Sequence, residues 1–284
     1  MTAALTCPVR GCGEALSWEE ARCACPRGHS FDRARSGYVN LLTPQDKRAK
    51  EPGDPRESVR ARARLLDRGV GAHVLEALCG LPAMRELRAR AAVLDVGCGD
   101  GWFLSALAAR FPIEAYGVDI STAAVDTAAR RTARVRWIAA NADRRLPFAD
   151  GAFDLVLSIT ARRNAAEFRR LIRPGGALVV VVPAPDDLAE LRAAVLGAAI
   201  QRDRGEPLAR ALADGFDLTD RLEARASLSL DGDALRDLLA TTYRGARRSE
   251  AARAAGLDRM DVTASAEILL FRRQHAGTSP ESGK

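Results

Sequence analysis

The sequence predicts an α/β fold, in which helices cover both faces of a mostly parallel sheet, preceded by a small metal-binding module. The first observation is that apolar runs typical of buried strands alternate with helical segments from residue 91 onward. Such alternation is typical of parallel sheets, because each parallel connection needs a crossover segment. The second is a cluster of cysteine and histidine within the first 29 residues. That segment is too short to bury much core, so a metal ion would stand in for one.

The metal-binding module is predicted from two pairs of ligands, Cys7 with Cys12 and Cys25 with His29. Tetrahedral zinc takes four such ligands, and a short loop between the pairs lets a small chain wrap the ion. Cys23 lies two residues before Cys25 and is an alternative ligand. An incidental cluster without metal is the other interpretation that the spacing leaves open.

Residues 1–42 are expected to form this module, and residues 43–90 a linker followed by helices. The segment 43–58 is rich in charge, proline and glycine, which is typical of a linker or mobile loop. Helices are predicted over about 58–67 and 72–89. The arginines of the first helix are expected to be mainly solvated surface: Arg60, Arg62 and Arg64.

The segment 91–275 is expected to hold the sheet. Strands are predicted over 91–96, 114–118, 135–139, 153–159 and 177–182, and helices over 102–110, 121–132 and 165–172. Ser121 is a candidate N-cap. The remainder, 186–275, is expected to be rich in helix and to close with an alternating strand near 262–271. The polar tail, 276–284, is expected to be disordered.

Composition bounds the class of protein. A hydrophobic content of 47% is enough for a sizeable core, and the net charge of +6 is compatible with a nucleic-acid partner. No apolar run is long enough to span a membrane, and the N-terminus lacks a secretory signal. These features predict a soluble, cytoplasmic protein without a membrane partner, in which reduced cysteines favour metal over disulfides.

A glycine loop follows the strand predicted over 91–96 and opens the next helix: Gly97-Cys98-Gly99-Asp100-Gly101. Glycine lets the backbone approach a ligand closely, although dinucleotide-binding enzymes share this layout. Two acids favour S-adenosylmethionine instead. Asp95 would engage the methionine portion, directly or through water, and Asp119 would accept hydrogen bonds from the ribose hydroxyls.

Two later features strengthen the prediction of S-adenosylmethionine. Leu-Pro-Phe-Ala-Asp-Gly-Ala-Phe-Asp at 146–154, with Arg-Pro-Gly-Gly at 173–176, is typical of class I methyltransferases, whose domain is Rossmann-like. Asn141 and Ala142 follow a predicted strand, where they are placed to meet the adenine ring. A simple strand-end cap is the alternative for Asn141.

With both sites in place, the chain resembles the RlmA family of 23S rRNA guanine-N1 methyltransferases over nearly its whole length. The strongest match is Cys-Pro-Arg-Gly-His at 25–29, then Phe-Asp at 31–32 and Gly-Tyr-Val-Asn-Leu-Leu at 37–42. The segments Arg-x-x-Leu-Leu-Asp-x-Gly at 62–69 and Val-Leu-Asp-Val-Gly-Cys-Gly at 93–99 also match.

The resemblance implies a homodimer in which the zinc module helps to grip a hairpin of 23S rRNA. Family members act as housekeeping enzymes or as self-resistance enzymes in antibiotic producers. For this sequence the resemblance implies cofactor contacts in the glycine loop and at Phe103 and Leu104. It also implies four zinc ligands: Cys7, Cys12, Cys25 and His29.

The chain departs from the family pattern at positions that bear on the target nucleotide. Four residues separate Cys7 from Cys12 where the family usually has two, and Gly71 stands where a tyrosine is expected. Asp187 stands where the family has a histidine near the cofactor. It is a candidate proton acceptor, with a helix-capping aspartate as the alternative.

The segment 159–162 replaces an aromatic-Ala-Pro sequence that faces the target base in class I enzymes. Arg162 and Arg163, in or directly after it, are candidates to hold phosphates or the guanine O6 edge, or are ordinary surface arginines. Two other functions stay open at this level: a small-molecule methyltransferase of an antibiotic pathway, and a zinc-containing RNA-binding protein without catalysis.

Overall fold

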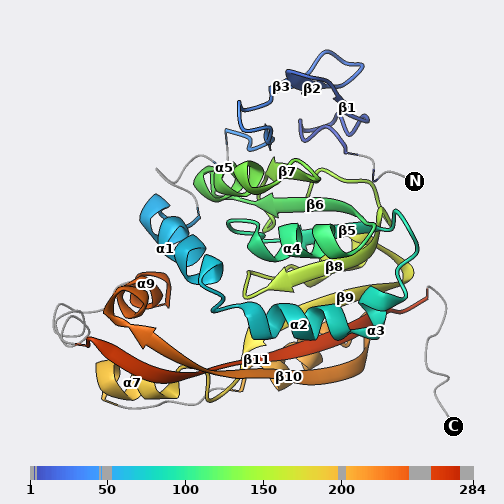
Figure 1. Ribbon diagram of the computed structural model, residues 1–284. Helices are drawn as coiled ribbons and strands as arrows, with labels where there is room; N and C mark the ends of the chain where they lie inside the picture. The colour runs from blue at the N-terminus through green and yellow to red at the C-terminus, as the bar shows by residue number, and fades with distance from the viewer. Residues whose placement is uncertain are drawn as a thin grey trace, which may run out of the picture.

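The computed structural model describes residues 3, 5–44, 46, 53–197, 203–242 and 257–275. Its main sheet has the strand order β10-β11-β9-β8-β5-β6-β7-β4, with a second, three-stranded sheet beside it (Figure 1). The tail 276–284 and part of the linker lie outside the described residues. None of the described helices is long and apolar enough to cross a membrane.

The predicted strands between 91 and 182, together with β4, which was not predicted, form the parallel part of the main sheet. Their carboxyl ends meet at one edge, which is where ligands bind in open α/β sheets. The parallel strands are β4 (Val39–Asn40), β7 (Val135–Ala139), β6 (Glu114–Asp119), β5 (Ala92–Val96), β8 (Phe153–Ile159) and β9 (Ile172–Pro183). The last strand, β11 (Arg259–Arg273), runs antiparallel to both β9 and β10 (Phe216–Asp231).

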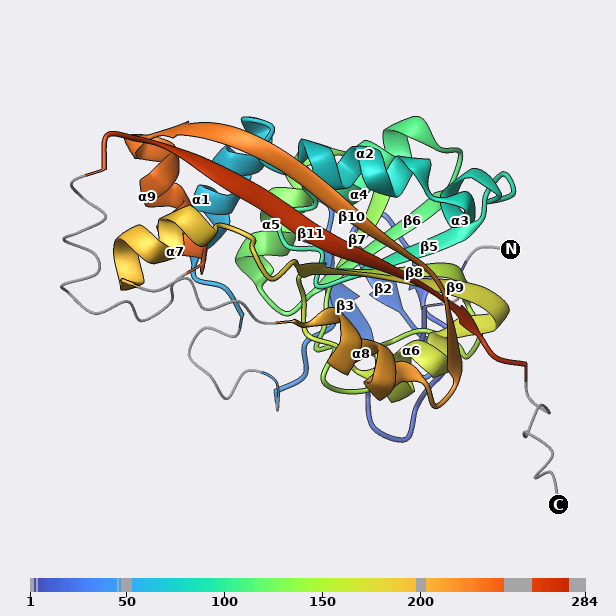
Figure 2. The same ribbon diagram turned by 90° about the horizontal axis from the view of Figure 1, so that it is seen from below.

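Alternating side chains of the strands pack into two layers of core. Val93 and Leu155 face one layer, whereas Leu94 and Val156 face the other. The first layer is covered by α2 (Ala72–Gly80), α3 (Pro82–Arg85), α4 (Trp102–Arg110) and α5 (Thr122–Arg131). The second is covered by α6 (Ala165–Leu171) and α8 (Gly205–Leu212), which lie across the sheet from α2 and α4 (Figure 2). The sheet is therefore covered on both faces, as predicted.

A third cluster surrounds the far ends of β10 and β11. It contains Leu65, Leu191 and Leu235, all buried. They come from α1 (Arg56–Asp67), α7 (Ala189–Leu196) and α9 (Gly232–Thr242). This cluster holds α1 beside the carboxyl ends of the parallel strands (Figure 1).

Two predictions about secondary structure are wrong. The helix predicted over 72–89 breaks at Leu81, which is extended (φ −60°, ψ 136°) because the ring of Pro82 disfavours a helical residue before it. The segment predicted to be rich in helix contains the strand β10. Its exposed and partly buried residues alternate over 222–230 as expected for an edge strand with one solvated face.

The N-terminal module is a small antiparallel sheet of β1 (Ser17–Trp18), β2 (Arg22–Ala24) and β3 (Ser30–Asp32). The chain then enters the main sheet through β4, which pairs with β7. The buried residues of the module belong to the same cluster as Tyr116, Phe148 and Phe153 of the large domain: Ala3, Leu5, Cys7, Leu16, Cys23 and Cys25. The module thus covers part of the second face of the sheet.

Candidate metal and cofactor sites

The four predicted zinc ligands lie together. Their ligand atoms are all within 4.8 Å of one another. Cys7 Sγ and Cys25 Sγ lie 3.5 and 3.4 Å from His29 Nδ1, and Cys12 Sγ lies 3.8 Å from Cys25 Sγ. Zinc with bonds of about 2.0–2.3 Å needs tetrahedral edges of roughly 3.3–3.8 Å. The ligand set therefore fits zinc.

Tight turns bring each pair of ligands together. The Cys12 amide donates to Val9 O at 2.9 Å, and the Cys25 amide donates to His29 O at 3.0 Å. Cys23 is fully buried in the shared core and is not part of the group of four. Because its side chain faces the core, Cys23 is not a competing ligand in this arrangement.

The glycine loop closes against the end of β8. Gly97 has φ +78°, and a Cβ there would lie 2.3 Å from Ala161 Cβ, so only glycine fits. The Gly99 amide donates to Asp119 Oδ2 at 3.0 Å, and the Ser121 amide donates to Asp119 Oδ1 at 2.8 Å. Asp119 thus ties the loop to the start of α5, where Ser121 is the N-cap, as predicted.

Asp95 lies under the loop at the end of β5. It is 2% exposed, and its Oδ1 atom has no hydrogen-bond partner in the described part of the chain. Burial raises the pKa of Asp95 to about 7, and burial also raises the pKa of Asp119. A buried, unpartnered carboxylate oxygen costs free energy unless a ligand satisfies it. The ammonium group of S-adenosylmethionine is a suitable partner, so this site fits the cofactor.

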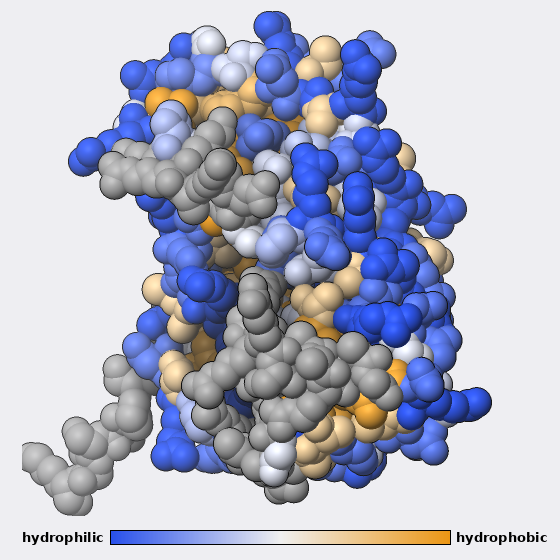
Figure 3. Space-filling model, turned by 90° about the vertical axis from the view of Figure 1, so that its left-hand side faces the viewer, coloured by the Kyte–Doolittle hydropathy of each residue, from blue (hydrophilic) through white to orange (hydrophobic). Residues whose placement is uncertain are grey.

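A cavity of about 820 Å³ opens at the carboxyl edge of the sheet. Figure 3 views the molecule from this side and shows apolar surface in a hollow bordered by hydrophilic side chains. The predicted site residues that line the cavity are Gly97, Gly99, Phe103, Asp119, Asn141, Ala142, Arg162 and Asp187. Those that do not line it are Asp95, Cys98, Leu104 and Arg163.

Two predicted cofactor residues face the core rather than the cavity. The side chains of Cys98 and Leu104 are buried in the first core layer. Any contact of Cys98 with the cofactor would therefore come from its backbone, whereas Leu104 would support Phe103 from behind.

Asp187 is oriented by β11. Its Oδ1 accepts a hydrogen bond from the Ser265 amide at 3.0 Å, and burial raises the pKa of Asp187. The N-cap position of α7 is held by Leu188, not by Asp187. The helix-cap alternative is therefore not what the geometry shows, and the carboxyl group lies at the wall of the cavity.

Of the other polar candidates, Asn141 and Arg162 have partners within the protein. Asn141 Nδ2 donates to Asp46 Oδ1 at 3.0 Å, and Asn141 Oδ1 accepts from the Asp143 amide at 2.9 Å, as expected for a strand-end cap. Arg162 lies 3.3 Å from Asp143 with its side chain 86% exposed. Burial and the nearby Arg204 lower the pKa of Arg163.

The sequence reasoning missed several residues of the cavity wall. Arg62 was expected to be mainly solvated surface, His73 was not a candidate, and Ser265 comes from the closing strand. The Arg-x-x-Leu-Leu segment at 62–66 was a signal for Arg62, because its buried leucines fix which side of α1 faces the domain. No comparable signal marks Ser265, since its position depends on pairing between distant segments.

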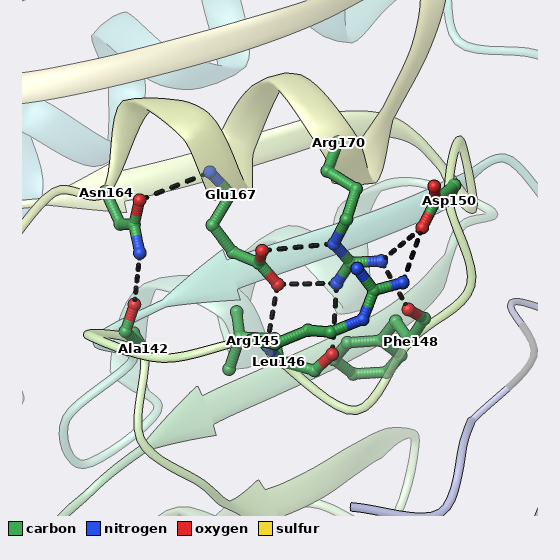
Figure 4. Close-up of polar contacts among 8 residues, drawn as sticks. All are labelled: Ala142, Arg145, Leu146, Phe148, Asp150, Asn164, Glu167 and Arg170. Atoms are coloured by element: carbon green, nitrogen blue, oxygen red, sulfur yellow. Dashed lines mark hydrogen bonds and ion pairs between the residues drawn. The ribbon is translucent and has the colours of Figure 1, made fainter. Parts of the chain in front are cut away.

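An ion pair between Glu167 and Arg170 of α6 supports the loop between β7 and β8 (Figure 4). Glu167 accepts hydrogen bonds from the Leu146 amide at 2.6 Å and from Arg170, and Arg170 donates to Phe148 O at 2.6 Å. Asn164 donates to Ala142 O at 3.3 Å. Helix α6 therefore holds the whole loop between β7 and β8 in place.

The zinc module rests on the same loop. The Thr6 amide donates to Pro147 O at 2.8 Å, and Leu5 forms a bridge with Phe148. One loop thus contacts the module at 147–148 and forms the cavity wall at 141–143.

Comparisons with known proteins agree with both sites. Residues 5–50 match a zinc-ribbon family described as "RlmA, N-terminal", and residues 93–176 match a family described as "Methyltransferase domain". The chain is 41% identical over 235 residues to a 23S rRNA (guanine(748)-N(1))-methyltransferase of Streptomyces fradiae, covering 81% of each chain.

A putative 23S rRNA (guanine-N(1)-)-methyltransferase of Micromonospora griseorubida is 36% identical, covering 66% of this chain and 68% of that protein. Among solved structures, the YcgJ protein of Bacillus subtilis superposes with a TM-score of 0.53 at 18% identity. That match covers 72% of this chain and 99% of YcgJ, and it supports the fold alone.

Proposed function

The chain belongs to the family of 23S rRNA (guanine-N1-)methyltransferases, and on that premise we propose that it methylates N1 of a guanine in 23S rRNA. The observation that carries the proposal is a four-ligand zinc ribbon seated on the loop that also walls the cofactor cavity. A methyltransferase of small molecules leaves such a ribbon without a task, whereas a folded RNA offers a surface for it to contact.

The residues proposed to hold the cofactor lie around the glycine loop. Asp95, which lies beneath the loop and outside the cavity wall, would hold the methionyl ammonium group directly or through water, and Asp119 would hold the ribose hydroxyls. The adenine ring would lie near Asn141 and Ala142, with Phe103 beneath the cofactor. The zinc ion would be held by Cys7, Cys12, Cys25 and His29.

The chemistry required of the protein is alignment and proton transfer. S-adenosylmethionine supplies an electrophilic methyl group on its sulfonium. Guanine N1 carries a proton that must leave as the new N–C bond forms, and Asp187 is proposed to accept it. A half-buried carboxylate with a raised pKa is a stronger base than an exposed one, which suits this role.

RNA contacts are proposed at the rim of the cavity. Arg162 lies at the rim, and its exposed guanidinium is available to phosphates or the guanine O6 edge. Arg163, the next residue, is also exposed and would act beside it. A homodimer with a basic groove between its halves would suit a hairpin. A chain that acts on ribosomal RNA would work in the cytoplasm.

Transfer of a labelled methyl group tests the function. The protein is incubated with labelled S-adenosylmethionine and unmodified 23S rRNA, free and within 50S subunits. We expect label in one guanine, located by mass spectrometry of nuclease digests and by a primer-extension stop. Label in no rRNA nucleotide of either substrate would overturn the proposal, and transfer to a metabolite instead would favour the small-molecule alternative.

A further inference from the structure

Arg62 projects from α1 into the cavity wall. The buried residues Val59, Leu65 and Leu66 fix the inner face of this helix, and Arg62 lies beside them, half-buried. Its Nη2 donates to Thr160 Oγ1 at 3.3 Å. Arg62 therefore reaches the segment after β8 from a helix that is almost 100 residues earlier in the chain.

The same guanidinium lies against the glycine loop. Arg62 Nε is 3.8 Å from the position that a Cβ would take on Gly99, which is ordinary van der Waals contact. Its positive charge opposes the effect of burial on the pKa of both Asp95 and Asp119. Arg62 therefore lies near Asp95 and Asp119, on the other side of the glycine loop. These are the two acids predicted to hold the cofactor.

Among the described residues, two arginines line the cavity, Arg62 and Arg162, and they differ in their partners and exposure. Arg162 is paired with Asp143 and is mostly solvated. Arg62 makes no ion pair within the described part of the chain; its side chain bonds to the neutral hydroxyl of Thr160. A half-buried cation without a carboxylate partner, aimed into a cavity, is suited to an anionic ligand group.

Thr160 gives this cation a fixed support. The residue has φ +52°, a left-handed conformation that is rare for a β-branched side chain. Its amide donates to Val181 O at 3.0 Å, which ties the segment to β9. Strained residues of this kind persist where the surrounding structure fixes them, often beside a ligand site.

The methionyl end of the cofactor carries an ammonium and a carboxylate on one carbon atom. Asp95 offers the negative partner for the ammonium, which leaves the carboxylate in need of a cation. We propose that Arg62, supported by Thr160, binds the α-carboxylate of S-adenosylmethionine and positions the cofactor for transfer. This proposal rests on the proposed use of that cofactor, but not on the identity of the RNA.

The test compares two ligands that differ by one carboxylate. Calorimetry measures the dissociation constants of S-adenosylmethionine and its decarboxylated analogue for the wild type, Arg62→Ala and Arg62→Lys. The matched control is Arg60→Ala. Arg60 lies on the same helix, two residues before Arg62, and its side chain is exposed. No RNA is present, so failure of the rRNA proposal leaves this measurement unaffected.

In the wild type, loss of the carboxylate is expected to weaken binding by roughly 10- to 100-fold, as for a charge-assisted hydrogen bond. In Arg62→Ala the two ligands should bind within about 2-fold of each other, with Arg62→Lys in between and Arg60→Ala like the wild type. Thermal unfolding checks that every variant is folded.

Two results would overturn the proposal. If Arg62→Ala weakens both ligands equally, Arg62 acts on the structure of the cavity and not on the carboxylate. If Arg62→Ala binds S-adenosylmethionine as tightly as the wild type, Arg62 serves another partner, such as an RNA phosphate.

Discussion

The zinc module and the glycine loop reach a defined geometry by different means. In the module, four side chains converge on one point, and the surrounding strands are two or three residues long. In the loop, Asp95 and Asp119 are fixed by the ends of two paired strands within a continuous core. The buried residues of the module belong to a cluster that they share with the large domain. The glycine loop, by contrast, lies at the ends of strands within the core of the large domain itself.

This difference means that the two sites should fail separately. Loss of metal removes what orders the module but leaves the parallel sheet intact. The loop between β7 and β8, held by Glu167 and Arg170, is the place where one change could affect both. The following experiments test how far this separation holds.

Removal of zinc is expected to have the largest effect. Cys25→Ala or His29→Ala should lower rRNA methylation by about 1,000-fold or more, because structural zinc supplies much of the folding free energy of such modules. The dissociation constant for S-adenosylmethionine should change by less than about 3-fold, since the sheet does not depend on the metal.

Metal analysis, methyl transfer and calorimetry measure these outcomes, with Cys79→Ser as a control for loss of a thiol far from the ligands in sequence. Full zinc content in Cys25→Ala would show that the ligand set is wrong. A parallel loss of cofactor binding would show that the two sites are not separate.

Breaking the ion pair beneath the shared loop should affect both sites. The side chains of Glu167 and Arg170 are 9% and 12% exposed, so Glu167→Gln leaves a buried guanidinium partly unpaired. We expect a loss of about 3 kcal/mol in the free energy of unfolding, measured with denaturant. The exposed control Glu206→Gln should change it by less than about 0.5 kcal/mol.

If the folded Glu167→Gln variant loses both cofactor affinity and rRNA methylation, the loop between β7 and β8 couples the two sites. An unchanged free energy of unfolding would show that the ion pair between Glu167 and Arg170, drawn in Figure 4, does not support the structure.

Asp187→Asn tests the cofactor cavity without touching the module. Loss of the proton acceptor should lower the rate of methyl transfer by about 100-fold while zinc content stays constant. Because burial raises the pKa of Asp187, wild-type activity should fall as the pH is lowered through a value above the ordinary 3.8. The rate-against-pH profile of the variant should lose this step, whereas the exposed control Asp214→Asn should keep it.

Asp95→Asn should stabilise the ligand-free protein while weakening cofactor binding. The pKa of Asp95 is raised from 3.8 to about 7, so between these values the folded state holds a proton that the unfolded state has lost. Stability of the wild type therefore falls as the pH rises through this window.

At pH 8 the variant should be more stable than the wild type by about 2 kcal/mol, and the difference should shrink toward pH 4. Denaturant unfolding at the two pH values measures this. A destabilised variant at pH 8 would show that the Asp95 carboxylate has a partner in the free protein.

The local patterns predicted every parallel strand except β4, and they indicated candidate site residues that the structure brings together, because their signals are short-range. A buried run such as Val93–Val96 followed by glycines predicts a strand and a turn wherever it is placed. The spacing of Cys25 and His29 likewise lets both ligands reach one ion whatever the rest of the chain does. The break before Pro82 was equally local and could have been predicted.

The sequence by itself therefore determined the glycine loop and the parallel strands other than β4, and it indicated the four candidate zinc ligands. Only the tertiary structure decided that Arg62 faces Gly99 and Thr160, and that Asp187 is held by Ser265. The physical reason is that these contacts join segments about 40 to 100 residues apart. Which side chains meet there depends on how α1, β10 and β11 pack against the finished sheet, not on the pattern within any one segment.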